Sequence, residues 1–257
     1  MLRLLLWTVT GILSVLVVAL VFLPITLLTP FIESQTQGRI TLGDAQGTIW
    51  KGSAFIGSAP AANAPITPLL PGRFAWKISP TLLLGIVEIE LANASALSTP
   101  LHITGNWREL LISPASITLP AERLASLGAP LNTLRPSGQM RLDWQPLRVS
   151  LADGMAQLNG RMDLQLTDIS SRLSPIKPLG AYNLNLVWQG QQAAVTLTTL
   201  QGPLLLDGSG MLNNGHLRFS GTAQAATGQE LALANLLNLL GQRRFIGGKD
   251  IIALEIQ

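Results

Sequence analysis

The chain has 257 residues and no cysteine, and its 17 basic and 14 acidic residues give a net charge of +3. The lack of cysteine excludes disulfides, thiol chemistry and thiolate metal sites. The basic residues are scattered, with no run longer than Arg243-Arg244, which argues against a nucleic-acid-binding surface.

The first feature along the chain is a run of twenty uncharged, mostly apolar positions, residues 4–23. As an α-helix this run would span roughly 30 Å, the thickness of the hydrocarbon core of a bilayer. It is too long for a cleaved signal peptide, and the residues after it have no Ala-x-Ala-like cleavage site. We therefore predict a retained transmembrane helix that ends or kinks at Pro24.

The orientation follows from the short tail before this run. Residues 1–3 carry Arg3 and the terminal amine, and short positive tails stay on the cytoplasmic side. The sequence therefore predicts a single-pass membrane protein with residues 1–3 in the cytoplasm and residues 24–257 on the far side of the membrane, which in a bacterial chain is the periplasm.

Beyond the anchor, alternating polar and apolar residues predict strands with one buried face. The clearest stretches are residues 86–91, 139–144, 161–166, 182–188 and 194–198, with shorter ones at 204–206 and 217–219. Short strands joined by tight turns favour antiparallel pairing, because parallel pairing needs long crossovers.

Glycine-containing segments predict the turns between these strands. Asn214-Gly215 suits a type I′ hairpin, since both residues tolerate positive φ. Residues 190–192 and Asp153-Gly154 predict two further turns, and residues 207–210 predict a kink or bulge. The Pro- and Ala-rich residues 58–71 predict a long loop, because prolines at this density oppose both helix and central strand.

Two short helices are predicted. Residues 120–127 begin with proline and are followed by Gly128, which is typical of a helix start and stop. Residues 229–241 form an amphipathic pattern with Asn235 on its narrow polar side and Gly241 as the stop. We expect its wide leucine surface to pack across the sheet or to contact a partner.

These features together predict a mainly β protein. One N-terminal transmembrane helix precedes an elongated, curved antiparallel β-sheet domain with one or two short helices. Whether this sheet forms an open half-barrel or groove, as in AsmA-like proteins, or closes into a barrel is left open by the pattern.

The sequence contains few residues that could form a metal site or a nucleophilic site. His102 lies in a strand-like stretch and His216 beside a turn, and we expect neither to bind a metal. Residues 174–177 match the Ser-x-x-Lys pattern of penicillin-binding enzymes. That pattern needs a helix, which Pro175 and Pro178 oppose.

Carboxylates also fail to form a recognisable acid–base pair. Asp143, Asp153, Asp163 and Asp168 fall in predicted strands and turns, where solvated side chains are expected. Asn93-Ala94-Ser95 fits a glycosylation acceptor that has no meaning in a bacterial chain. We therefore predict no catalytic residue, no metal site, no cofactor and no enzymatic activity.

Several glycine-rich segments are more distinctive. Residues 47–54 predict a strand bounded by glycines, and residues 178–182 read Pro-Leu-Gly-Ala-Tyr. Two further segments follow, at residues 199–204 and 206–210. We expect the characteristic residues of these segments to form turns, packing contacts or a partner contact: Gly47, Trp50, Gly52, Pro178, Gly180, Tyr182, Gly202, Gly208 and Gly210.

The succession of these segments after one N-terminal anchor resembles the type II secretion system protein N family, also called general secretion pathway protein N. The resemblance covers essentially the whole chain, and residues 47–54 are its most specific part. It implies a bitopic inner-membrane component of the apparatus that exports folded proteins from the periplasm of Gram-negative bacteria. It transfers no active-site residue.

The leading hypothesis is therefore a non-enzymatic accessory subunit that supports export across the outer membrane. Its partners would be other type II secretion subunits, in the inner-membrane platform or the outer-membrane secretin, reached in part through exposed sheet edges. The alternative is a membrane-anchored periplasmic lipid-binding or lipid-bridging protein of AsmA-like type. An open, aliphatic-lined trough would favour that alternative, and a filled core would favour a scaffold. A third class, a tethered periplasmic hydrolase, would need converging carboxylates or a buried Ser–Lys pair.

Overall fold

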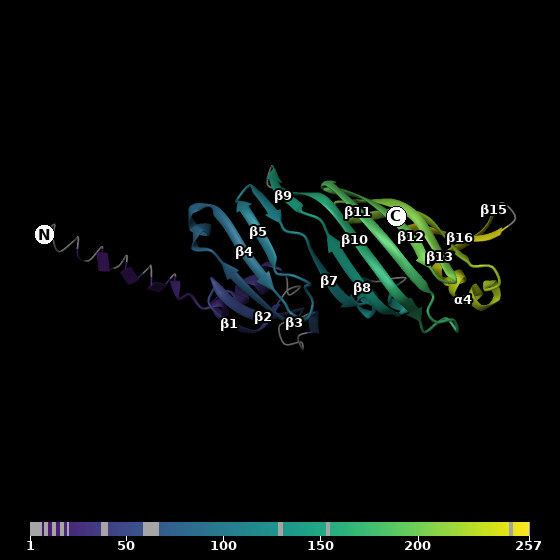
Figure 1. Cartoon of the computed structure of the whole chain (residues 1–257), viewed down its shortest axis with the longest axis horizontal. Coiled ribbons are helices and arrows are strands. Elements are labelled where there is room, and N and C mark those ends of the chain that lie inside the picture. The colour runs from purple at the N-terminus through teal and green to yellow at the C-terminus, as the bar shows by residue number, and fades with distance from the viewer. Residues whose placement is uncertain are drawn as a thin grey trace. The chain divides into compact units, whose positions relative to one another are not determined.

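The computed structural model describes residues 7, 10, 11, 14, 15, 18, 19, 21–36, 41–58, 67–127, 131–152, 155–246 and 249–256. These residues form two compact units, Met1–Asn106 (unit 1) and Trp107–Gln257 (unit 2). Both are built mainly from antiparallel strands with few short helices, which confirms the predicted β class (Figure 1).

The predicted anchor at residues 4–23 lies in part outside the described residues. Its described residues between Trp7 and Val21 are helical, and the apolar side chains among them, such as Val15 and Val18, are exposed. Within the described part of the chain, no helix combines the length and the apolar character needed to cross a bilayer. The transmembrane helix therefore stays a prediction.

The described part of unit 1 contains five strands whose pairing follows chain order from β1 to β5. Its elements are η1 (Ile25–Leu27), α2 (Thr29–Gln35), β1 (Thr41–Gly47), β2 (Lys51–Ser58), β3 (Thr67–Ile78), η2 (Pro80–Leu84), β4 (Ile86–Ala92) and β5 (Leu101–Asn106).

Alternation along these strands separates an apolar face from a polar one. Trp76 pairs with Leu91, and Ala54, Phe74 and Val87 are the buried apolar residues of the described sheet. The next row, Lys77 opposite Glu90, lies on the opposite face. The small core of unit 1 therefore lies on one side of its sheet.

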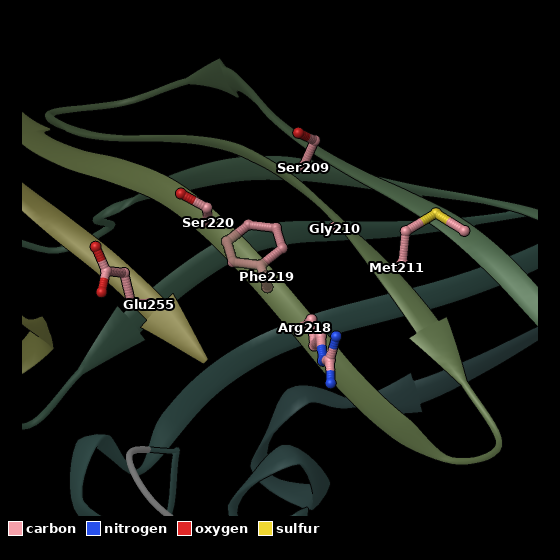
Figure 2. A pocket seen from close by; sticks show the side chains of 7 residues that line it. All are labelled: Ser209, Gly210, Met211, Arg218, Phe219, Ser220 and Glu255. Atoms are coloured by element: carbon pink, nitrogen blue, oxygen red, sulfur yellow. The ribbon is translucent and has the colours of Figure 1, made fainter. Parts of the chain in front are cut away.

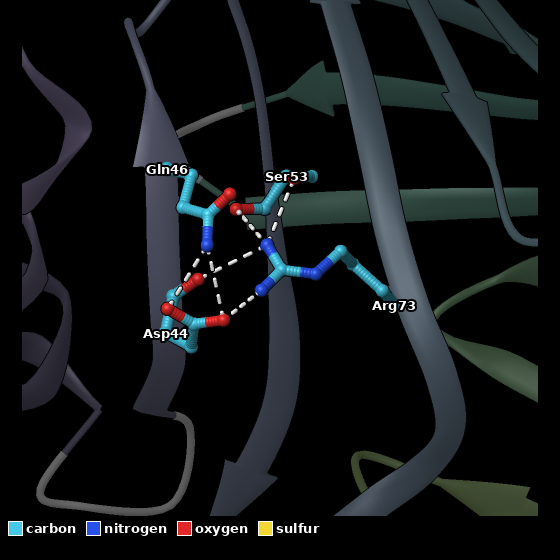
Figure 3. Close-up of polar contacts among 4 residues, drawn as sticks. All are labelled: Asp44, Gln46, Ser53 and Arg73. Carbon is cyan, nitrogen blue, oxygen red and sulfur yellow. Dashed lines mark hydrogen bonds and ion pairs between the residues drawn. The ribbon is translucent and has the colours of Figure 1, made fainter.

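Strand β1 is the edge of unit 1, and it is irregular. Its register with β2 shifts between Gly43 and Gln46, and Asp44 adopts a positive φ of 46°. The Arg73 side chain donates to the Asp44 carboxylate and carbonyl and to Ser53, as Figure 3 shows. Such a bulge, held by a side chain from β3, blunts an edge that would otherwise present regular main-chain groups.

Two sequence predictions in unit 1 are wrong. Residues 47–54 are not one strand: β1 ends at Gly47, residues 48–50 turn, and β2 begins at Lys51. The chain reverses there because Gly47 has a φ of 88° and pairs with Gly52. The loop predicted at 58–71 is also too long, since β3 starts at Thr67 and includes two prolines; residues 59–66 lie outside the described residues.

Unit 2 holds the larger sheet, with strand order β6-β9-β10-β11-β12-β13-β14-β16-β15; β8 also pairs with β10, and β7 pairs with β8. Its strands are β6 (Glu109–Ile112), β7 (Ala115–Pro120), β8 (Pro136–Trp144), β9 (Leu147–Ala152), β10 (Met155–Ser171), β11 (Gly180–Gly190), β12 (Gln192–Gln201), β13 (Leu204–Asn213), β14 (His216–Ala225), β15 (Gln242–Ile246) and β16 (Lys249–Ile256). Its helices are η3 (Ala121–Leu127), α3 (Leu131–Leu134) and α4 (Glu230–Leu240).

The register of unit 2 sorts its side chains by polarity. One row across five strands consists of Leu142, Leu164, Leu184, Leu197 and Gly208. The neighbouring row, on the opposite face, consists of Asp143, Asp163, Asn185, Thr196 and Ser209. We call the leucine-bearing side the inner face and the other side the outer face. The described inner-face positions from β7 to β14 carry no charged residue.

Helix α4 covers one end of the inner face. Leu233, Leu236 and Leu237 form a buried cluster with Leu204 of β13 and Ala223 of β14, among others. This confirms the predicted C-terminal helix and shows that its leucine surface packs on the sheet. The opposite side of α4 remains in solvent.

The other predictions for unit 2 have mixed outcomes. The turns at Asn214-Gly215 and after Gly190 are confirmed, with positive φ at all three residues; Asp153-Gly154 lies outside the described residues. The helix predicted at 120–127 exists as a 3₁₀-helix that follows the last strand residue, Pro120. The kink predicted at 207–210 is wrong, because β13 keeps a continuous register with β14 there.

The two sides of α4 differ in their expected contribution to stability. Leu233→Ala removes a fully buried side chain from the cluster, and we expect it to lower the free energy of unfolding by about 2–5 kcal/mol. Leu231→Ala, at a residue that is 96% exposed on the same helix, should change it by less than about 0.5 kcal/mol. Urea unfolding of the detergent-solubilised chain measures both, and equal losses would contradict this packing.

Candidate functional site

Three of the predicted residues meet at the covered end of the inner face. Gly202 has a φ of 122°, and a Cβ there would lie 2.3 Å from the Gly180 Cα. A Cβ on Gly180 would in turn lie 2.8 Å from the Tyr182 hydroxyl oxygen. Only glycine allows this approach, so the two glycines serve to bring β11 against the β12–β13 connection.

The Tyr182 side chain fills the space that these glycines leave. It is 2% exposed, and its hydroxyl donates a 3.0 Å hydrogen bond to the Leu204 carbonyl. Burial raises the pKa of the Tyr182 phenol well above its usual value. Tyr182 thus joins β11 to β13 through a neutral, buried hydroxyl.

Pro178 leads into this contact without joining the cavity. The Lys177–Pro178 peptide is cis, and Pro178 itself is exposed. The next residue, Leu179, is buried in the same cluster as Leu204. The Leu204 N–H donates to the Leu179 carbonyl at 3.0 Å.

Gly208 and Gly210 lie farther along β13 on the inner face. A Cβ on Gly208 would be 2.5 Å from the Phe219 ring, and one on Gly210 would be 2.3 Å from the Arg218 carbonyl. Phe219 on β14 therefore occupies the position that a larger residue at 208 would need. Gly208 thus makes room for the aromatic ring, whereas Gly210 lies close to the β14 backbone.

The predicted residues of unit 1 form a separate cluster at the β1–β2 turn. The Trp76 ring covers Gly52, where a Cβ would lie 2.4 Å from it. The indole N–H of Trp76 points to the carbonyls of Thr48 and Ile49, at 3.3 and 3.1 Å. The Trp50 carbonyl accepts from the Ile78 N–H of β3 at 2.7 Å. Gly47, Trp50 and Gly52 thus shape a hairpin end.

Sequence reasoning did not single out Trp76 or Phe219, although each covers one of the predicted glycines. The only available signal was an aromatic residue on a strand, which is common in any sheet. Cross-strand register, which brings Trp76 opposite Gly52, is what defines the contact.

A partly open apolar cavity lies beside Tyr182. Its volume is about 120 Å³, and it lies between the sheet, α4, η3 and α3. Its lining includes Leu124, Leu166, Leu206, Leu236 and Leu240. None of the described lining residues carries a charged side chain, so this lining suits an apolar group.

Beyond this cavity the inner face is partly exposed. Met162, Leu186 and Trp188 lie on β10 and β11, and Leu212 lies on β13; all four are neither fully buried nor fully exposed. The Trp188 indole nitrogen is buried and has no hydrogen-bond partner among the described residues. A contiguous apolar surface of this kind is typical of a surface that contacts an apolar partner.

A larger and shallower hollow lies elsewhere on the sheet, and Phe219 of the inner face is part of its lining. It measures about 690 Å³ and is formed by β13, β14 and β16 around Ser209, Met211, Arg218 and Glu255, as Figure 2 shows. Its side chains are a mixture of polar, apolar and charged groups. Nothing in their arrangement indicates a reaction.

The residues considered for catalysis have structural surroundings. Ser174 is buried, and its hydroxyl accepts from the Ile176 N–H in a segment that is not helical, so it forms no helical pair with Lys177. Asp163 accepts from the Asn185 amide at 2.7 Å, and Asp168 lies at a register shift in β10. The described residues contain no cluster of histidines and carboxylates that could hold a metal ion.

A comparison with protein families shows the family of the chain. Residues 38–249, which span both units, match the model of the type II secretion system (T2SS) protein N family. The chain belongs to this family. No curated protein and no solved structure gives a significant match.

As a type II secretion system protein N, the chain has a general accessory role in type II protein secretion, and it associates with other components of that system. The matched residues include the Gly47 turn of unit 1 and the Gly180–Tyr182–Gly202 contact of unit 2. The family therefore covers both clusters in which the predicted residues lie.

The Tyr182 contact makes a prediction at high pH. The usual phenol pKa is about 10, and the folded state raises it, so the stabilisation from the bound proton is complete below about pH 10 and is lost as the pH rises above it. Because Tyr182 is the only tyrosine, phenolate absorbance reports this group alone. We expect that absorbance to appear only when the protein unfolds.

Two controls accompany this titration. The chain in urea should titrate near pH 10, and Tyr182→Phe should remove the phenolate signal and weaken the loss of stability above that pH. Reversible phenolate formation near pH 10 in the folded protein would show that Tyr182 is open to solvent.

Proposed function

We propose that this chain is a non-enzymatic accessory subunit of the inner-membrane part of the type II secretion apparatus. Residues 4–23 hold it in the bilayer with residues 1–3 in the cytoplasm, and both β units lie in the periplasm. There it supports the export of folded proteins across the outer membrane through contacts with the inner-membrane platform or the secretin.

The observation that carries this proposal is the family match over both units. Two further features support it. The run at 4–23 is long enough to span a bilayer as a helix, and its described apolar side chains are exposed. An anchored domain meets partners in the same membrane at a raised effective concentration.

The exposed side of α4 is the best-defined partner surface. Leu231, Asn235 and Leu239 are spaced by four residues and thus lie on one side of the helix. Leu231 is 96% exposed and Leu239 is 53% exposed. Two exposed leucines beside a short polar residue suit a contact in which apolar anchors enter a partner's groove.

This surface can be tested in the secreting cell. A photocrosslinking residue at Asn235 should give an adduct with another type II secretion subunit. Leu231→Glu combined with Leu239→Glu should abolish the adduct and reduce secretion, because buried anchors of this kind each contribute on the order of 2 kcal/mol to binding. Secretion and adduct yield are measured together.

The matched control is Leu200→Glu, which changes a leucine of the same unit that is 59% exposed at the end of β12. It should leave both readouts unchanged. Normal secretion in a deletion strain, with no adduct to any component of the apparatus, would refute the proposed function.

A second candidate function, lipid binding of the AsmA-like kind, is favoured by one observation. The described inner face is uncharged from β7 to β14, and it is partly exposed beyond the apolar cavity beside Tyr182. A lipid acyl chain would contact only apolar groups along this path. In this function, the inner face binds lipid while the anchor holds the protein near a bilayer.

Leu186→Glu tests this second function, because it puts a carboxylate in the middle of the inner face. We expect it to lower the amount of phospholipid that co-purifies with the full chain, since an unpaired charge against an acyl chain is costly. Val187→Glu, which changes the adjacent outer-face residue, should not. Mass spectrometry of extracted lipid gives the readout, urea unfolding checks both folds, and lipid-free wild-type protein would exclude this function.

A further inference from the structure

The turn between β3 and β4 exposes apolar side chains that the proposed function does not use. Leu84 is 82% exposed and Leu83 is 60% exposed, and Ile86 beside them is 49% exposed. Three large apolar residues gathered in a short segment are unusual on a protein surface in water. They indicate a segment that meets an apolar partner.

The turn has a defined shape rather than an extended tip. The Ser79 hydroxyl accepts from the Thr81 N–H and hydroxyl, and Pro80 starts η2. Gly85 ends it with a φ of 88°, and its N–H donates to the Leu82 carbonyl at 3.1 Å. The leucines are therefore presented on a capped turn, which lowers the entropy cost of docking them.

Backbone hydrogen bonds place this turn at the end of the sheet where the predicted anchor stops. The Ile49 N–H donates to the Leu23 carbonyl, the last residue of the apolar run, at 3.1 Å. Next to it, the Ile78 N–H donates to the Trp50 carbonyl at 2.7 Å, and Ser79 follows directly. Leu23, the β1–β2 turn and the β3–β4 turn thus follow one another along one end of unit 1.

Two cations lie at the same end. Lys51 and Lys77 pair directly across β2 and β3, and both are exposed. Glu90 is opposite Lys77 on the other side, and the exposed Glu88 lies nearer the turn, where its carbonyl accepts from the Ser79 N–H, so this face carries charges of both signs. Exposed leucines flanked by lysines match the chemistry of a bilayer surface, where apolar groups enter the acyl boundary and lysines reach the headgroups.

We propose that the β3–β4 turn is a second, interfacial membrane contact, in which Leu83 and Leu84 insert into the leaflet from which the anchor emerges. This inference rests on the proposed insertion of residues 4–23. The chosen occupant is phospholipid rather than protein because the turn is continuous with the end of the anchor. Two attachments at one end would restrict the rotation of unit 1 about the anchor.

The absence of cysteine allows a direct test on the full chain. Leu84→Cys, labelled with an environment-sensitive fluorophore, is reconstituted into vesicles of phosphatidylethanolamine and phosphatidylglycerol. We expect its emission to shift to shorter wavelength and to be quenched by lipids spin-labelled near the headgroup. The matched control is Thr99→Cys, at an exposed residue between β4 and β5 at the other end of the same strands, which should report water.

Val15→Cys, within the predicted anchor, separates the two claims. Quenching of its label by lipids spin-labelled deep in the acyl chain, with the Leu84 label in water, would overturn the interfacial contact and leave the anchor standing. An unquenched Val15 label would overturn the anchor and, with it, the interfacial contact that rests on the anchor. A blue shift at Leu84 without lipid quenching would mean a protein contact and would also overturn the inference.

The lysines give an independent readout. Lys51→Gln and Lys77→Gln should each reduce membrane insertion of the turn in vesicles rich in anionic lipid, since each lysine near such a surface is attracted to it. We expect the ratio of molecules with the turn inserted to molecules with the turn in water to decrease about fivefold. The decrease should fade at high salt. If all variants inserted the turn equally at low salt, the lysines would have no role in membrane binding.

Discussion

The structure of unit 2 depends on one constraint, the need to cover the apolar side of an antiparallel sheet. The register puts leucines from four strands in a single row and acidic, amide and hydroxyl residues in the next. Helix α4 and the short helices cover one end of that side and leave an apolar cavity beneath them. The rest of the inner face is apolar, and no described element covers it. This uncovered apolar surface bears on both candidate functions of this type II secretion protein N, scaffold and lipid carrier.

Much of the fold was predictable because alternation and turn chemistry are local properties. The strands around residues 139–144 and 182–188, the Asn214-Gly215 turn and the C-terminal helix all follow from short stretches of sequence. The predictions that were wrong concern residues whose structure depends on the strand with which they pair. Residues 47–54 contain a turn because Gly47 pairs with Gly52, and β13 stays regular through Gly208 because β14 supplies Phe219 to fill the space. Pattern alone does not reveal a partner strand.

The candidate site was predictable only in part for the same reason. Gly180, Tyr182 and Gly202 were identified as distinctive, and the structure brings them together. Their role, an approach of two backbones that a buried phenol completes, needs three-dimensional distances. Trp76 and the inner-face residues around Leu186 had no local signal that separates them from ordinary strand residues. The transmembrane helix at 4–23 was predicted from length and composition, and it stays a prediction that rests on them.

The blunted border of unit 1 has a consequence for how copies of this protein meet one another. Its outer strand carries a bulge at Asp44, and the carbonyl there already accepts from the Arg73 guanidinium. Helix α2 lies along the same strand, where Glu33 and Thr41 are hydrogen-bonded. The described part of this border therefore offers no straight ladder for a neighbouring molecule to extend, which opposes fibre-like stacking of copies there. A partner that met unit 1 at this border would be recognised by side chains, which can discriminate between surfaces in a way that main-chain pairing does not.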